Sequence, residues 1–138
     1  MKSKLRYHRI IAITIVFFSI WLTYKGVSHD WKYENGQQKV YGSTEDHTNE
    51  GVWTWYYPNG NKRMEGNFLS GKRDGRWVIW NESGIIINVS TYSNDKLNGP
   101  YIKYNDQGKK TEEGNYYNDV NDGKTIFYDD LGNRSNNP

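Results

Sequence analysis

The chain of 138 residues contains no cysteine, few leucines and alanines, and only three histidines. Without cysteine it has no disulfide, no lipid anchor on a cysteine, no thiolate metal site and no cysteine nucleophile. Aromatic residues make up 16% of the sequence, and there are 14 glycines. Scarce helix formers and abundant aromatics and glycines favour β-structure with many turns over long helices.

Motifs for catalysis, phosphate binding or metal binding are also missing. The sequence has no G-x-G-x-x-G, P-loop or G-x-S-x-G pattern. His29 and His47 are 18 residues apart, and neither has a second ligand at close spacing. Glu112 and Glu113 are adjacent on an expected strand, so they point to opposite faces, which is poor geometry for a catalytic pair. We therefore expect a non-enzymatic protein with no catalytic residues, no metal and no cofactor.

Positive charge is concentrated at the N-terminus. Five of the 18 lysines and arginines precede residue 26, which leaves 13 against 16 acidic residues and a net charge of −3 for residues 26–138. A basic face that could bind nucleic-acid phosphates is therefore not expected. The five residues are Lys2, Lys4, Arg6, Arg9 and Lys25.

Residues 1–26 combine this basic head with one apolar run, Ile10 to Tyr24. As a helix the run would measure roughly 22 Å, which is short for a bilayer core of about 30 Å. Two main interpretations remain open: a signal anchor extended by interfacial aromatics, or a cleaved signal peptide with Gly26 and Ser28 near the cut. A buried helix of a soluble protein is a third. The basic head predicts a cytoplasmic N-terminus, with the rest membrane-anchored outside the cytoplasm or secreted after cleavage.

The remainder of the chain repeats every 24 residues. Glycines and aromatic residues recur at fixed phases, which is the mark of a tandem array. We place a repeat domain at 27–132, with units at about 27–50, 51–74, 75–98, 99–122 and 123–132, and a tail at 133–138. The phases are Gly51, Gly75, Gly99 and Gly123; Gly36, Gly60, Gly84, Gly108 and Gly132; Tyr56, Trp80, Tyr104 and Tyr128; and Phe68, Tyr92 and Tyr116.

Each unit is expected to form a β-hairpin. Strands such as "VWTWYY" and "RWVIWN" are joined to the next strand by turns such as "YPNG" and "NESG". Pro58 and Gly60 fit a type I turn with a G1 bulge. Wider turns such as "SGKRDG" should connect the units. The predicted fold class is all-β: an elongated antiparallel sheet of about nine strands, preceded by an N-terminal hydrophobic helix.

Strand alternation divides the aromatic residues between two faces. Tyr56, Trp80, Tyr104 and Tyr128 share one face with Thr54, Val78, Ile102 and Ile126, and we interpret these two phases as the core stripe. Rings could lie over the small residues Gly66, Ser90 and Gly114. The other face is a candidate binding surface if the strands are flat; alternatively, bulges or a covering layer bury both sets. Its candidate residues are Trp53, Trp55, Trp77 and Tyr101.

The pattern "G-x-W-x-x-(Y/W)-x-x-x-G", followed by an aromatic residue and "N-G/D-K-x-x-G", resembles the MORN repeat. The resemblance spans about Val27 to Gly132 and is closest to the bacterial variant in proteins described as YwqK-like antitoxins. It implies an elongated sheet of hairpins that binds proteins or lies at membranes.

Three functions follow as hypotheses. The first is a membrane-tethered module for protein–protein interaction. The second is an antitoxin or immunity protein that neutralises a toxin. The third is a glycan- or cell-wall-binding module, because exposed Trp and Tyr rings can stack on sugars.

Overall fold

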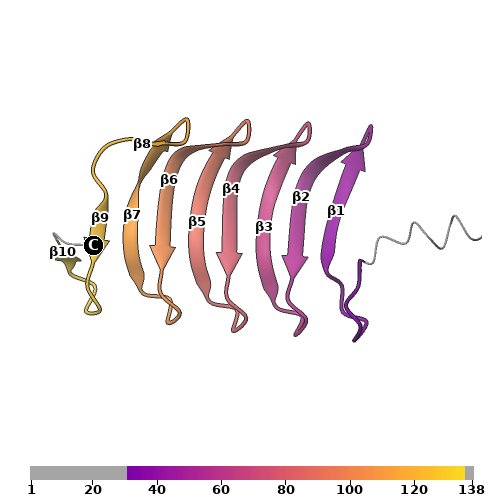
Figure 1. Cartoon of the computed structure of the whole chain (residues 1–138), viewed down its shortest axis with the longest axis horizontal. Helices are drawn as coiled ribbons and strands as arrows, with labels where there is room; N and C mark the ends of the chain where they lie inside the picture. The colour runs from indigo at the N-terminus through magenta and orange to yellow at the C-terminus, as the bar shows by residue number, and fades with distance from the viewer. Residues whose placement is uncertain (1–30, 136–138) are drawn as a thin grey trace, which may run out of the picture. The chain divides into compact units, whose positions relative to one another are not determined.

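The computed structural model describes residues 31–135, and these form one antiparallel sheet in the unit Lys32–Pro138. Figure 1 shows the strands side by side in chain order from β1 to β7. The order is then completed by β9 and β10, while β8 pairs only with β7. The strands are β1 (Val40–Glu45), β2 (Thr48–Tyr56), β3 (Lys62–Leu69), β4 (Lys72–Trp80), β5 (Ile86–Ser93), β6 (Lys96–Tyr104), β7 (Lys110–Tyr117), β8 (Val120–Asn121), β9 (Ile126–Tyr128) and β10 (Arg134–Ser135).

The predicted fold class needs a correction. The described residues form 10 strands rather than nine, and they contain no helix. The fold class of residues 31–135 is therefore all-β. The N-terminal hydrophobic helix that we predicted, and the signal anchor or signal peptide at 1–26, fall outside the described residues. Within residues 31–135 there is no helix long and apolar enough to cross a membrane.

The predicted G1-bulge turns are confirmed. At the first of them the Gly60 N–H donates to the Tyr57 carbonyl at 2.9 Å, and the Tyr57 N–H donates to the Asn61 carbonyl at 2.8 Å. Gly60 has a φ of +88°, a conformation that glycine adopts without steric cost. The pairing register shifts between Trp55 and Tyr56, where the bulge lies. The same pair of hydrogen bonds recurs at the turns that end on Gly36, Gly84, Gly108 and Gly132.

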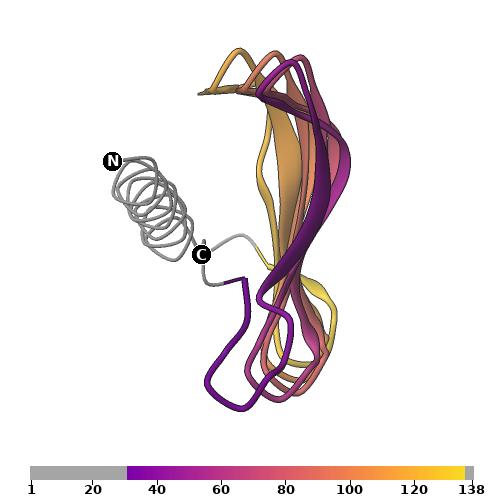
Figure 2. The ribbon, with the colours of Figure 1, turned by 90° about the vertical axis from the view of Figure 1, so that its right-hand side faces the viewer.

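The connections between units are tighter than predicted. Each is a two-residue turn with both residues at positive φ, as in Asn94-Asp95 with values of 52° and 70°. This is the type I′ geometry, whose twist matches that of the flanking strands. Gly75, which we had assigned to a wider turn, instead lies inside β4 with a φ of +76°. Next to it the register between β3 and β4 shifts, and the strands bend (Figure 2).

The buried aromatic rings are not those of the predicted core stripe. Trp53, Trp77 and Tyr101 are only 6%, 5% and 3% exposed, whereas Tyr56 and Trp80 are half-buried. From the predicted stripe only Thr54 and Val78 are buried. Because the described residues form a single layer, each of these rings is covered by residues of the adjacent strands. The surface closest to each ring is the bare backbone of one of those strands.

Glycine provides that bare backbone, as the small-residue phase predicted. A Cβ atom built on Gly66 would lie 2.1 Å from Cδ2 of Trp77, and one on Gly42 would lie 2.1 Å from the same atom of Trp53. Each indole therefore lies directly on the main chain of the preceding strand. Any side chain at Gly42 or Gly66 would displace the ring.

Candidate functional site

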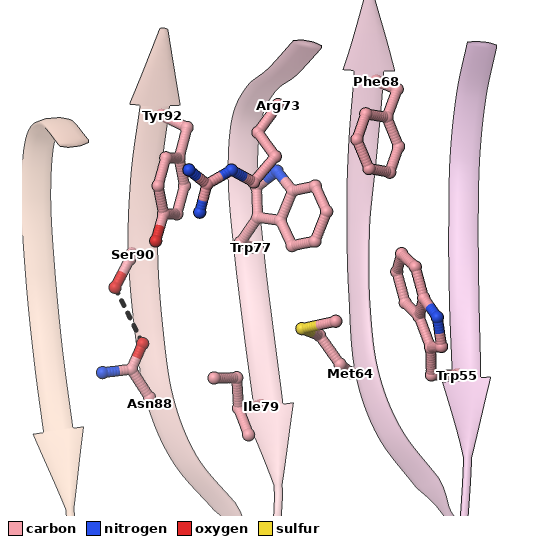
Figure 3. Close-up of a pocket in the computed structure, with 9 residues that line it drawn as sticks. All are labelled: Trp55, Met64, Phe68, Arg73, Trp77, Ile79, Asn88, Ser90 and Tyr92. Carbon is pink, nitrogen blue, oxygen red and sulfur yellow. Dashed lines mark hydrogen bonds between the residues drawn. The ribbon is translucent and has the colours of Figure 1, made fainter. Parts of the chain in front are cut away.

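The face that carries Trp53, Trp55, Trp77, Ile79 and Tyr101 is called the groove face here, because it contains a hollow of about 240 Å³ over β2 to β5. Figure 3 shows the side chains that surround it. Among residues 31–135 no second layer of strands or helices packs on this face. The lining residues are Trp55, Met64, Phe68, Arg73, Trp77, Ile79, Asn88, Ser90 and Tyr92.

Strand register explains why the part of the groove drawn lower in Figure 3 is formed by one row of side chains. Trp55 pairs with Met64, Met64 with Ile79, and Ile79 with Asn88, so four neighbouring strands each place one residue in line. Paired residues on neighbouring strands point to the same face of a sheet. The row runs from an indole through two aliphatic side chains to an amide.

The part of the groove drawn higher in Figure 3 is aromatic. Trp77 packs edge-to-face against Phe68 and Tyr92, with ring centroids 5.1 Å and 5.9 Å apart. Trp55 approaches both Phe68 and Trp77 at about 6 Å. Such tilted pairs stabilise a cluster beyond the area that they bury, so this wall is a fixed surface.

The position of the groove follows from a departure from the repeat. Ser90 occupies the phase of Gly42, Gly66 and Gly114, and its Cβ fills the space in which a ring of the next strand would lie. The Trp77 ring packs on Gly66 of the preceding strand, β3. The Tyr101 ring instead packs on Gly114 of the following strand, β7, where a built Cβ would lie 2.7 Å from the ring. The Ser90 hydroxyl donates to Oδ1 of Asn88 at 2.7 Å, and both line the groove.

Tyr101 is held away from the groove by polar contacts on β7. Its hydroxyl donates to Glu112 at 2.6 Å, and Lys103 forms an ion pair with the same carboxylate at 2.9 Å. Burial, reinforced by this acceptor, raises the pKa of Tyr101. Burial also acts to raise the pKa of Glu112, but the hydrogen bonds from Tyr101 and Lys103 outweigh it, and the pKa is lowered.

Arg73 is the charged residue of the groove lining. Its guanidinium lies 4.2 Å from the Tyr92 ring centroid, a cation–π contact. Its Nε pairs with Asp95 at 3.1 Å, and the side chains of the pair are 39% and 49% exposed. A hydrogen bond from the Arg73 backbone, followed by one from its side chain, lowers the pKa of Asp95.

The four candidate residues from the sequence separate into two groups. Trp55 and Trp77 line the groove, whereas Trp53 and Tyr101 are buried on the same face outside its lining. Sequence reasoning placed Ile79 on this face but missed Met64, Arg73 and Asn88. The strand register could have indicated Met64 and Asn88, which lie in one row with Trp55 and Ile79, but the register depends on where each bulge falls. Within residues 31–135 no group of three or more side chains is suited to hold a metal ion.

Residues 49–69 match a MORN repeat variant. The matched MORN segment covers nearly all of the β2–β3 hairpin, including its G1-bulge turn. No curated protein sequence matches the chain. The MORN match identifies a repeat module, and nothing in these comparisons supports the antitoxin assignment.

Proposed function

We propose that this chain is a non-enzymatic, membrane-tethered repeat module that binds a partner protein through the groove on β2–β5. The observation that carries the proposal is the aromatic and aliphatic hollow on a sheet face that no other described element covers. Open apolar surfaces of this kind are typical of interaction sites, and their binding energy concentrates in aromatic anchors such as Trp and Tyr. The MORN match supports a module for protein or membrane interactions.

Membrane tethering rests on the sequence of residues 1–26 alone. The basic residues before the apolar run favour a cytoplasmic N-terminus, with the repeats on the opposite side of the membrane. A reporter that is active only outside the cytoplasm, fused after residue 138, should be active. If only a cytoplasmic reporter is active in the same fusion, the repeats lie inside and the topology is wrong.

Partner binding is tested by proximity labelling in the native cell with matched variants. Met64→Glu places a charge in the half-buried row of the groove, and Met64→Gln is a milder polar change of similar length. Val52→Glu places the same charge on the opposite face, where Val52 is 59% exposed. The wild type and the Val52→Glu variant should label a common set of proteins. Both Met64 variants should fail to label these proteins, although their melting curves should still be those of folded proteins. Equal labelling by a folded Met64→Glu variant would contradict binding through the groove.

The labelled proteins also separate the alternative functions. A partner that is toxic when expressed alone would favour an antitoxin or immunity role. Loss of labelling after removal of cell-wall glycans would favour a glycan-binding module. Either result would replace general protein binding as the proposed function.

A further inference from the structure

We propose that the groove binds a segment of a partner protein in which a bulky apolar side chain adjoins an acidic side chain. This inference rests on the proposed function and specifies the partner's chemistry. It follows from three features of the groove: its size, its charge and one unpaired donor.

The size of the groove fits side chains rather than a cofactor. Pockets that hold drug-sized ligands begin at about 300 Å³, and this hollow measures about 240 Å³. Trp55, Met64 and Ile79 line one part of it with carbon and sulfur atoms. One or two apolar side chains of a partner can therefore be buried there.

The charge of the groove is positive at one end. Arg73 is the one charged residue in the lining, and no acidic residue accompanies it there. Of the five N–H donors in a guanidinium, two have acceptors among the described residues, namely Oδ1 and the carbonyl of Asp95. The remaining N–H groups can donate hydrogen bonds to a second carboxylate. Because both side chains of the Arg73–Asp95 pair are well exposed, that pair is weak and can rearrange.

An unpaired hydrogen-bond donor lies at the same end. Among the described residues, Nε1 of Trp77 is the buried side-chain nitrogen or oxygen without a hydrogen-bond partner. The corresponding nitrogen of Trp53 donates to the Ser43 carbonyl at 3.0 Å. Arg73 lies at the same end of the groove, because both its guanidinium and the Trp77 ring pack against Tyr92. A buried donor without an acceptor is costly, so a carboxylate that displaces Arg73 slightly and reaches this N–H gains a bond that the free protein lacks.

A sugar ring fits these features less well. Sugars stack on open aromatic faces, whereas Trp77 is 5% exposed and has Phe68 and Tyr92 packed against it edge-to-face. The apolar row also offers few groups that could bond to sugar hydroxyls. An acidic and apolar peptide is therefore the occupant that we test.

The test uses three short peptides with blocked ends and the isotope-labelled full-length chain in lipid nanodiscs. The first is acetyl-Gly-Glu-Leu-Gly-amide, the second replaces Glu by Gln, and the third replaces Leu by Ser. At millimolar concentrations the first should shift the NMR signals of the Trp77 indole N–H and the Met64 methyl group. It should bind about tenfold more tightly than the Gln peptide, because a Gln amide can accept a hydrogen bond from Arg73 but cannot form an ion pair with it. The Ser peptide should bind more weakly than both.

Arg73→Gln should abolish the preference for Glu over Gln and keep the Met64 shift. Arg76→Gln removes an equal charge from the exposed opposite face of β4 and should keep the preference. If the Glu and Gln peptides bind equally in the wild type, the acidic part of the inference is wrong, while protein binding through the groove stands. If no peptide shifts either signal, or if a chitin oligosaccharide shifts them instead, the inference is overturned. The labelling experiment with the Met64 variants tests the proposed function independently of these results.

Discussion

At the scale of single residues, the fold depends on aromatic rings that lie on glycine backbone. No large side chain in the described part of the chain is completely buried, and the most buried aromatic rings are those of Trp53, Trp77 and Tyr101. The first two rest on Gly42 and Gly66 of the preceding strand. In a single-layer sheet this contact takes the place of a second layer, because the ring covers main-chain atoms that would otherwise face water.

Gly66→Ala should therefore destabilise the protein. The added Cβ would lie 2.1 Å from the Trp77 ring, so the indole must move out of its contact. We expect a loss of about 1–3 kcal/mol in the free energy of unfolding, as for other overpacked sites, measured by chemical denaturation. Ser90→Ala is the matched control in the same phase. It adds no atom and removes only the bond to Asn88, and should cost about 1 kcal/mol. Equal melting of wild type and Gly66→Ala would contradict this packing.

Ion pairs on the opposite face make stability depend on pH. Lys62 donates a hydrogen bond to Glu65 at 2.6 Å, which is the main cause of the lowered Glu65 pKa. A carboxylate with a lowered pKa in the folded state stabilises the fold above its unfolded pKa of about 4.3. That stabilisation is lost as the pH falls through the folded-state value.

Lys62→Met should make this acid-induced loss of stability shallower. The comparison is a series of denaturation curves at several pH values below about 5. Arg63→Met removes the same charge from the neighbouring exposed position and should leave the slope unchanged. If both variants follow the wild-type curve, Lys62 does not set the pKa of Glu65 in solution.

At the scale of elements, the two-residue turns fix the spacing of the hairpins. Ser70 has a φ of +50°, a conformation that Asn tolerates better than Ser. Asn already occupies the equivalent position at Asn94 and Asn118. Ser70→Asn should therefore raise the free energy of unfolding by about 0.5 kcal/mol. Ser93→Asn, which places the same residue at a strand position, should be neutral or slightly destabilising. A loss of stability from Ser70→Asn would argue against this turn geometry.

Sequence reasoning predicted the hairpins and their G1-bulge turns correctly, because these depend on local patterns. Pro58 and Gly60 are together a turn signal within four residues, and the recurring glycines mark the period. It failed for Gly75, since the same positive φ serves equally in a turn or in a bulge within a strand. It also failed for the groove, because only the three-dimensional register brings Trp55, Met64 and Ile79 into one row. The way in which Ser90 redirects Tyr101 is a contact between strands that no local pattern contains.

At the scale of the whole sheet, each unit is joined to the next by contacts that repeat along the chain. The Tyr33 hydroxyl donates to the Tyr56 carbonyl at 2.8 Å, and the Tyr57 hydroxyl donates to the Trp80 carbonyl at 2.9 Å. The Asn59 amide donates to the Glu82 carbonyl at 2.8 Å. Such an array gains stability mainly from nearest neighbours, so a unit with one neighbour is less stable than a unit with two.

Hydrogen exchange should therefore reveal a gradient toward the C-terminal end of the sheet. Strands β4 and β5 are paired along their length on both sides, whereas β9 pairs with β7 through only two residue pairs and β10 is two residues long. We expect amides in the middle of β4, such as that of Val78, to exchange at least about a hundredfold more slowly than those of β9, because local opening requires much less energy where neighbours are few. Ser90→Ala provides a perturbation from within. If stability comes mainly from contacts between neighbouring strands, this variant should increase the exchange rates in β4 to β6 more than those in β9. The amides of β9 already exchange through local opening. Uniform protection from β2 to β10, falling equally in the variant, would instead mean that the sheet unfolds as one cooperative unit and that the nearest-neighbour description is wrong.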